Sequence, residues 1–251
     1  MCRRMLIGTR NCRGFSLVEL MISLVVGFIA MAVLLGIYLS NTSTARFHSA
    51  VLKVQENGRF AIDVIGRTAR MAGYDDPMTT TEVPAPLIEG SNNAGGAQIS
   101  QTGLKPDAHT LSIRYEGGID IRDCQGQSVA ADDWVTNMYA ISTDDNLVCA
   151  TLTNNSGLVS DAITLAEGVE DMRVIYGLDI DATGDINRYV RAQAVSDWSQ
   201  VRSLRVALLV NSIDTVLLKD DDVCLGCRVF NGTPDDRLVR EEFQTTIEVR
   251  N

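Results

Sequence analysis

The stretch RGFSLVELMI, residues 13–22, places one acidic side chain, Glu19, at the start of an apolar run. Residues 20–39 follow without a charge, and their number is close to what a helix needs to cross the hydrocarbon core of a bilayer. A carboxylate at that depth costs roughly 2 to 3 kcal/mol unless a positive charge lies nearby. The stretch therefore predicts a membrane helix whose Glu19 has a cationic partner.

The residues before this run carry only positive charge. Arginines stand at positions 3, 4, 10 and 13, with no acidic residue among the first fourteen. By the positive-inside rule they keep the N-terminus in the cytosol, so the rest of the chain goes to the far side of the membrane. An ordinary cleaved signal peptide has a shorter apolar core and an A-x-A cleavage site, neither of which is present.

A cut between Gly14 and Phe15 would supply the missing cation. The new α-amine of Phe15 would lie one helical turn from Glu19, and in a bundle of identical helices it could also meet the Glu19 of a neighbour. A plain signal anchor explains the leader and the apolar run, but it does not explain Glu19.

Residues 14–20, Gly-Phe-Ser-Leu-Val-Glu-Leu, resemble the class III signal of type IV prepilins. The resemblance implies that a prepilin peptidase cuts after Gly14 and that the new N-terminal Phe15 is methylated. It also implies that Glu19 is an assembly residue that pairs with a cation in a growing filament. One departure is Gly36, which stands where major pilins often have proline.

The next segment reads as an amphipathic helix. Residues 41–74 are polar and free of proline, and apolar or small side chains recur at helical spacing: Phe47, Val51, Val54, Gly58, Ile62, Ile65 and Ala69. We expect this helix to continue the membrane helix, to pack on a sheet and to end at Gly73.

The remainder reads as a β-rich domain. Residues 75–108 are rich in Pro, Gly, Thr, Ser and Asn and predict a long loop. Strand-like runs follow at 110–115, 147–152, 162–165, 172–178, 204–210 and 243–249. Short turns between β-branched runs favour an antiparallel sheet, so the predicted class is α+β. The prepilin resemblance implies the type IV pilin fold, in which one long helix packs on such a sheet.

Four domain segments follow from these patterns. They are a cleaved basic leader (1–14), a transmembrane assembly helix (15–40), an amphipathic stalk helix (41–74) and a globular β-rich periplasmic domain (75–251).

Further motifs resemble the PilW type of minor pilin. They lie at residues 55–61, 70–74, 168–177, 198–209 and 245–251. The resemblance implies a non-catalytic inner-membrane protein that helps to initiate or cap a type IV pilus, supporting twitching motility, adhesion and possibly DNA uptake. The implied partners are other minor pilins, the major pilin, prepilin peptidase, the inner-membrane assembly platform and a tip adhesin. A J-type pseudopilin of a type II secretion system shares the processing signal. A membrane-anchored periplasmic binding module, with an uncut N-terminus, is the alternative from another class.

The four cysteines that follow the membrane segment favour disulfides in an oxidising compartment. They permit three pairings, and short separations favour Cys124 with Cys149 and Cys224 with Cys227. A zinc site on the same four cysteines is the alternative, but it lacks a second CxxC and a nearby histidine.

Charge and motifs argue against two classes of function. The formal net charge is −10, and such a surface repels nucleic-acid phosphates. Only His48 and His109 occur, and no glycine-rich phosphate loop, nucleophile elbow or HExxH motif is present. The sequence predicts neither an enzyme nor direct binding of nucleic acid.

One loop resembles a calcium ligand set, with Asp179, Asp181, Asp185 and Asn187 at alternate positions around a glycine. The twelfth position of that spacing is Val190 rather than glutamate, so the match is incomplete. We expect no cofactor, with structural calcium in this loop as the alternative to a plain hairpin turn.

Overall fold

The computed structural model describes residues 16–77, 79, 82–93, 103–154, 159–215, 223–225 and 237–249, with backbone alone for 223–225. The chain divides into two compact units, Met1–Arg46 and Phe47–Asn251. The cleavage residues Gly14 and Phe15 and the cysteine Cys227 lie outside the described residues.

Helix α1 spans Leu17–Arg70, and its second half has a buried stripe that includes Val54, Gly58, Ile65 and Ala69 of the prediction, whereas Phe47, Val51 and Ile62 are half-buried. The buried residues are Ala50, Val54, Gly58, Ala61, Ile65, Gly66, Thr68 and Ala69. They recur at three- and four-residue steps, which places them on one face of the helix. After two further turn residues the backbone reaches Gly73, whose φ of 69° is the left-handed conformation expected where a helix ends.

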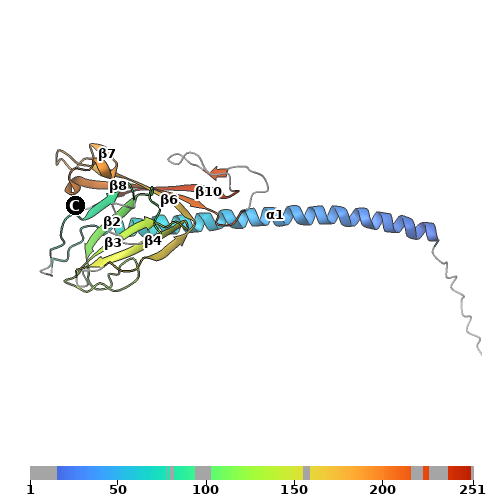
Figure 1. The fold of residues 1–251 in the computed structure, drawn as a ribbon, viewed down its shortest axis with the longest axis horizontal. Coiled ribbons are helices and arrows are strands. Elements are labelled where there is room, and N and C mark those ends of the chain that lie inside the picture. Colours follow the sequence, from blue (N-terminus) through green and yellow to red (C-terminus); the bar gives the residue numbers. More distant parts are fainter. Residues whose placement is uncertain are drawn as a thin grey trace, which may run out of the picture. The chain divides into compact units, whose positions relative to one another are not determined.

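The first sheet contains five strands in sequence order, all antiparallel (Figure 1). They are β1 (Ile88–Ser91), β2 (Thr110–Glu116), β3 (Trp134–Ile141), β4 (Asn146–Thr153) and β5 (Ile163–Glu167). Each strand pairs with the next one along the chain, so this sheet is a simple meander.

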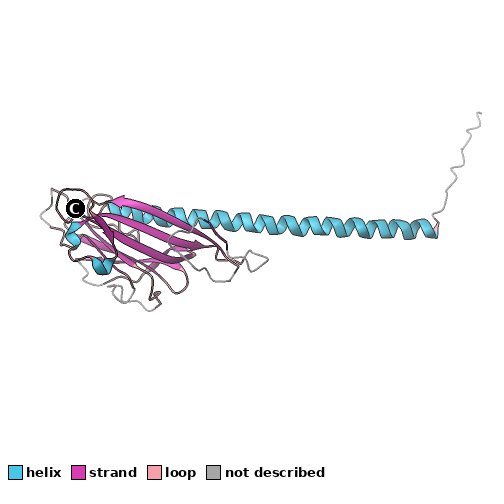
Figure 2. Cartoon of the chain, turned by 90° about the horizontal axis from the view of Figure 1, so that it is seen from above, coloured by secondary structure: helices cyan, strands magenta, loops and turns pink. Residues whose placement is uncertain are grey.

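The second sheet has the order β7-β6-β8-β10-β9. Its strands are β6 (Val169–Leu178), β7 (Arg188–Val190), β8 (Val201–Asn211), β9 (Val223–Leu225) and β10 (Val239–Glu248), and two short 3-10 helices, η2 (Ala192–Ala194) and η3 (Trp198–Gln200), precede β8. All pairs are antiparallel except β9 with β10, which is parallel. The strands are magenta in Figure 2.

The α+β class is confirmed, but the β-structure forms two sheets rather than the single expected one. Each of the six predicted runs contains a strand. The central strand β3 was not predicted, because its polar Thr136 and Asn137 interrupt the apolar pattern. Strand β1 lies inside residues 75–108, which were expected to be loop throughout.

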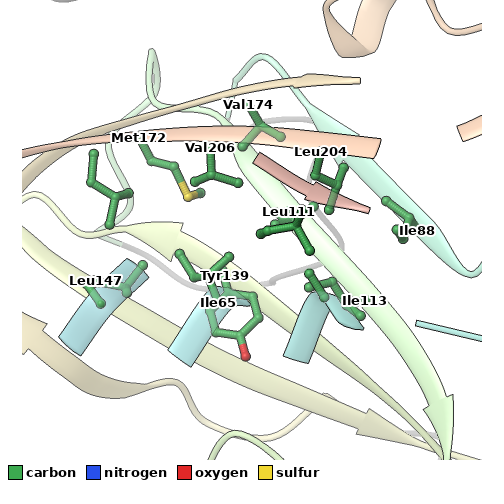
Figure 3. Packing of buried hydrophobic residues seen from close by; sticks show 14 of the residues in the cluster. Ile65, Ile88, Leu111, Ile113, Tyr139, Leu147, Met172, Val174, Leu204 and Val206 are labelled. Carbon is green, nitrogen blue, oxygen red and sulfur yellow. The ribbon is translucent and has the colours of Figure 1, made fainter. Parts of the chain in front are cut away.

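One hydrophobic core joins helix and both sheets (Figure 3). Ile65 of α1 packs in the same cluster as side chains of the first sheet (Ile88, Leu111, Ile113, Tyr139 and Leu147) and of the second (Met172, Val174, Leu204 and Val206). The buried Tyr139 hydroxyl donates to Thr68 Oγ1 on the helix at 2.8 Å, so its polar atom is satisfied. Burial of this stripe between the sheets holds the helix in place.

The helix passes close to the Phe243 side chain of β10 at Gly58. A Cβ atom built there would lie 2.2 Å from the ring of Phe243, closer than any real contact. At Gly66, by contrast, the nearest atoms to a built Cβ lie 3.9 to 4.0 Å away, which is ordinary contact. A side chain at Gly58 would therefore have to displace the Phe243 ring, whereas one at Gly66 would meet only ordinary contacts.

We predict opposite effects for alanine at these two helix glycines. Gly58→Ala should lower the free energy of unfolding by about 1 to 3 kcal/mol, since the Phe243 ring has to move. Gly66→Ala, the matched control, should raise it by up to about 1 kcal/mol through helix propensity. Urea unfolding of the full chain in detergent micelles measures both. A stabilising Gly58→Ala would contradict the packing described.

His109 links the start of β2 to strand β6 of the other sheet. Its backbone N–H donates to Met172 O at 3.1 Å, and its Nδ1 lies 2.9 Å from Val174 N and 3.1 Å from Val174 O. In the neutral ring with an unprotonated Nδ1, this atom accepts from the Val174 N–H. The side chain is buried, and that burial, with the nearby charges of Arg173 and Arg191, lowers the pKa of the imidazole. The folded state therefore favours the neutral form of the His109 ring.

The pKa shift of His109 predicts acid sensitivity. Because the folded pKa lies below the unfolded value near 6.5, the stabilising contribution of the neutral ring is complete above that pH and is lost as pH falls, at up to about 1.4 kcal/mol per pH unit. In His109→Asn the amide oxygen can still accept the Val174 N–H, so the loss of stability between pH 7.5 and 5.5 should be smaller than in the wild type. His48→Asn, at an exposed position of α1, is the control. Equal pH dependence in wild type and His109→Asn would refute the assignment.

Candidate functional site

Ser16 begins the membrane helix as an N-cap. Its Oγ accepts from Val18 N at 3.3 Å, and its carbonyl oxygen accepts from Leu20 N at 3.1 Å. Glu19 stands three residues after Ser16, which is the spacing of a capping box, and lies in the first turn, where the helix dipole favours negative charge. The start of the helix therefore favours a negative side chain at this position, independently of any assembly role.

The Glu19 carboxylate nevertheless lacks a partner in the described part of the chain. Glu19 is exposed, and its side chain makes no hydrogen bond or ion pair with any described residue. The neighbouring Ser23 hydroxyl donates to the backbone oxygens of Glu19 and Leu20, at 2.9 and 3.0 Å, and not to the carboxylate. A cation from elsewhere can thus reach Glu19 without displacing a contact with residues 16–77 or the other described ranges.

Glu19 lies beside a shallow groove on one face of this helix. The groove is lined by Ser16, Val18, Glu19, Ile22, Ser23, Val26, Gly27 and Ala30. Ser23, Gly27 and Ala30 are small, and a Cβ at Gly27 would meet nothing within 4 Å. Small residues at this spacing let another helix approach closely within a membrane.

The rest of the segment is apolar and uncovered. From Leu17 to Leu39 the large hydrophobic side chains are exposed, and this is the one described helix that is long and apolar enough to span a membrane. About 20 such residues rise roughly 30 Å, the thickness of the hydrocarbon core. Lipid tails or neighbouring helices fit this surface.

The cysteines Cys124 and Cys149 form a disulfide, which is the pairing that the short separation favoured. Cys124 N also donates to Asn137 Oδ1 at 3.2 Å, and the Asn137 amide donates to Tyr115 Oη at 2.8 Å. The long connection between β2 and β3 is thereby fixed to the first sheet. Cys224 lies in β9, and its pairing with Cys227 stays a prediction, since Cys227 is outside the described residues.

The loop that resembles a calcium ligand set joins β6 to β7. Two of its candidate ligands, Asp179 and Asn187, accept hydrogen bonds from backbone N–H groups of the loop itself. Asp179 is buried, and its two carboxylate oxygens accept from Thr183 N at 3.1 Å and Gly184 N at 3.0 Å. Asn187 Oδ1 accepts from Ile180 N at 2.6 Å.

The exposed carboxylates of the same loop are less constrained. Asp181 accepts from the Thr183 hydroxyl at 2.9 Å, and hydrogen bonds from Thr183 and Asn187 lower the pKa of its carboxyl. Asp185 is exposed. No group of three or more His, Cys, Asp or Glu side chains in the described ranges is arranged to hold a metal ion. Calcium binding by this loop stays an untested prediction.

Several buried or partly buried charged residues were not identified from the sequence. Arg240 is 1% exposed, and its Nε donates to Glu170 Oε2 at 2.7 Å. Lys105 forms an ion pair with Asp145 and donates to the Glu170 carbonyl oxygen at 2.8 Å. Glu116, the last residue of β2, is completely buried. No motif marks these residues, because their role depends on which segments the fold brings together.

Two family models match the chain. The prokaryotic N-terminal methylation motif matches residues 9–35. The family described as Type IV Pilus-assembly protein W (PilW) matches residues 134–251, slightly less than half of the chain. Both resemblances expected from the sequence, the prepilin signal and the PilW type, are confirmed.

Among solved structures, a type IV-like pilin from Thermus thermophilus is similar, with 15% sequence identity and a TM-score of 0.48. The similarity covers 78% of this chain and 95% of that chain. A comparison with curated proteins found no match.

We predict that the Cys124–Cys149 disulfide stabilises the globular unit. Replacing both cysteines by serine should lower the free energy of unfolding by roughly 3 to 4 kcal/mol, because the unfolded chain gains the conformations that the closed loop excluded. Serine at Cys2 and Cys12, in the leader, is the control. Urea unfolding in detergent micelles gives the difference, and a change below about 1 kcal/mol would count against the prediction.

Proposed function

We propose that this chain, which carries a prokaryotic N-terminal methylation motif and a PilW-type C-terminal region, is a minor pilin that initiates or caps assembly of a type IV pilus. The observation that supports an assembly role is the exposed Glu19, a carboxylate without a partner among the described residues, at the start of a helix that otherwise suits lipid.

In the proposed mechanism the membrane helix first anchors the prepilin. Prepilin peptidase cuts after Gly14, and the freed and methylated amine of Phe15 becomes the cation that Glu19 lacks. Pairing between the Glu19 of one subunit and the amine of its neighbour removes the cost of a lone carboxylate in an apolar environment. The same pairing sets the register of the two helices, because the carboxylate and the amine meet only when the two helices lie at one relative depth in the membrane.

The groove beside Glu19 supports a packing role for the same helix face. Small side chains at Ser23, Gly27 and Ala30 allow a neighbouring helix to lie close, which gains van der Waals contact where no hydrophobic effect operates. Glu19 and the groove thus provide a charge contact and a packing contact on one surface.

The proposed location follows from the leader charges. Arginines keep the N-terminus in the cytoplasm, so the globular unit lies in the periplasm, and the processed subunit then enters the filament. The proposed partners are other minor pilins, the major pilin, prepilin peptidase and the inner-membrane assembly platform, with a tip adhesin as a further one. The role is structural rather than catalytic, and twitching motility, adhesion and DNA uptake are its expected downstream effects.

Mass spectrometry of sheared, purified filaments tests this proposal. We expect this protein at low abundance, with a peptide that begins at methylated Phe15. The same processed terminus found only in the envelope favours a J-type pseudopilin over a pilus subunit. An intact Met1 leader overturns both readings and favours an anchored periplasmic module.

Substitution of Glu19 tests its role directly. We predict that Glu19→Gln is still inserted and cleaved but that its abundance in filaments falls at least about tenfold, since loss of an ion pair worth 1.4 kcal/mol already gives that factor. Glu56→Gln, the same change at an exposed site in the second half of α1, should leave abundance unchanged. Normal incorporation of Glu19→Gln would exclude charge pairing as the basis of assembly.

A further inference from the structure

Glu116 is a buried carboxylate that is only half satisfied. Its side chain is 0% exposed at the end of β2. One oxygen, Oε2, accepts from the backbone N–H of Asp76, whereas Oε1 has no hydrogen-bond partner. A buried polar atom without a partner costs about 1 to 3 kcal/mol, and more when it is charged, so such an atom needs an explanation.

The neighbour of Glu116 is another acid. Asp75 stands between Tyr74 and Asp76, which both bond to Glu116 through their backbone, so its carboxyl group lies near that of Glu116. Glu82 and Asp76 add negative charge nearby. Desolvation and then the contact with Glu116 raise the pKa of Asp75. Two ionised carboxylates cannot donate a hydrogen bond to each other and repel, so a cation or a shared proton between them would stabilise the pair.

The pair lies where the chain leaves the helix. Gly73 N donates to Arg114 O at 3.0 Å and Glu116 N donates to Tyr74 O at 2.9 Å, so the segment after α1 lies along the edge of β2. Asp75 is exposed while Glu116 is buried. Solvent therefore reaches Asp75 but not Glu116.

We propose that Asp75 and Glu116 bind a calcium ion at this junction. Both proposed ligands are carboxylate oxygens, and calcium accepts irregular sets of carboxylates, backbone carbonyls and water better than other common cations do. No three acidic, His or Cys side chains in the described ranges are gathered into a metal site, so water and backbone oxygens complete the coordination. With only two carboxylate ligands the affinity should be modest, with a Kd of about 10⁻⁴ to 10⁻³ M.

The bound ion would fasten the end of α1 to the first sheet. It would give Glu116 Oε1 a partner and would also offset the repulsion between the two carboxylates. This site differs from the loop between β6 and β7, where both carboxylate oxygens of Asp179 already accept backbone N–H groups. The inference does not depend on the assembly role of the chain.

Calcium titration of the full chain in detergent micelles tests the proposal. Equilibrium dialysis with radioactive calcium at pH 7.5 should give one ion per chain, and calcium should raise the unfolding temperature relative to EDTA, whereas magnesium at equal ionic strength should not. In Asp75→Asn, a change at an exposed position, calcium affinity should fall at least about tenfold. Asp181→Asn, in the other acidic loop, is the matched control and should bind as the wild type does.

Three results would overturn the site. The first is no calcium binding by the wild type, and the second is unchanged affinity in Asp75→Asn. The third is loss of binding in Asp181→Asn instead, which would assign the ion to the loop between β6 and β7. A shared proton is recognised separately, since acidification without calcium would then raise the unfolding temperature in the wild type but not in Asp75→Asn, while calcium would have no effect.

Discussion

The close approach of the second half of α1 to both sheets is the contact on which the globular unit depends. Gly58 gives room to the Phe243 ring, and Ile65 fills the space between the sheets. Two sheets that share few backbone hydrogen bonds need a common apolar partner, and the small and aliphatic residues of one helix face provide it. The helix is thus part of the core of this unit rather than an attachment to it.

Polar links between the sheets add specificity to that packing. His109 ties the start of β2 to β6, and Lys105, which precedes β2 in the chain, donates to the Glu170 carbonyl oxygen of β6. The buried pair of Arg240 and Glu170 joins β10 and β6 within the second sheet. Buried ion pairs add little net stability because desolvation offsets their attraction, but breaking one is costly. The hydrogen bonds of His109 and Lys105 favour one mutual placement of the sheets over others of similar apolar burial.

Much of the architecture could be predicted from local patterns. The membrane segment, the buried helix stripe and six strands each have a periodicity that the sequence displays. Strand β3 lacks one, since Thr136 and Asn137 are polar yet buried, and Asn137 is satisfied by Tyr115 and Cys124 from elsewhere in the chain. The division into two sheets and the exposed Asp75 beside the buried Glu116 depend on tertiary contacts, which one strand or helix cannot reveal. At the membrane helix, the sequence identified Glu19 and its chemistry, and the structure added the groove beside it.

The placement of β10 has a consequence for biogenesis. This C-terminal strand pairs between β8 and β9, and its Phe243 packs where the helix passes Gly58, a contact between residues 185 positions apart. The part of the helix stripe around Gly58 therefore stays uncovered until β10 has been synthesised. The globular unit cannot complete its packing before that point, and a chain that ends before β10 leaves apolar surface of the helix exposed.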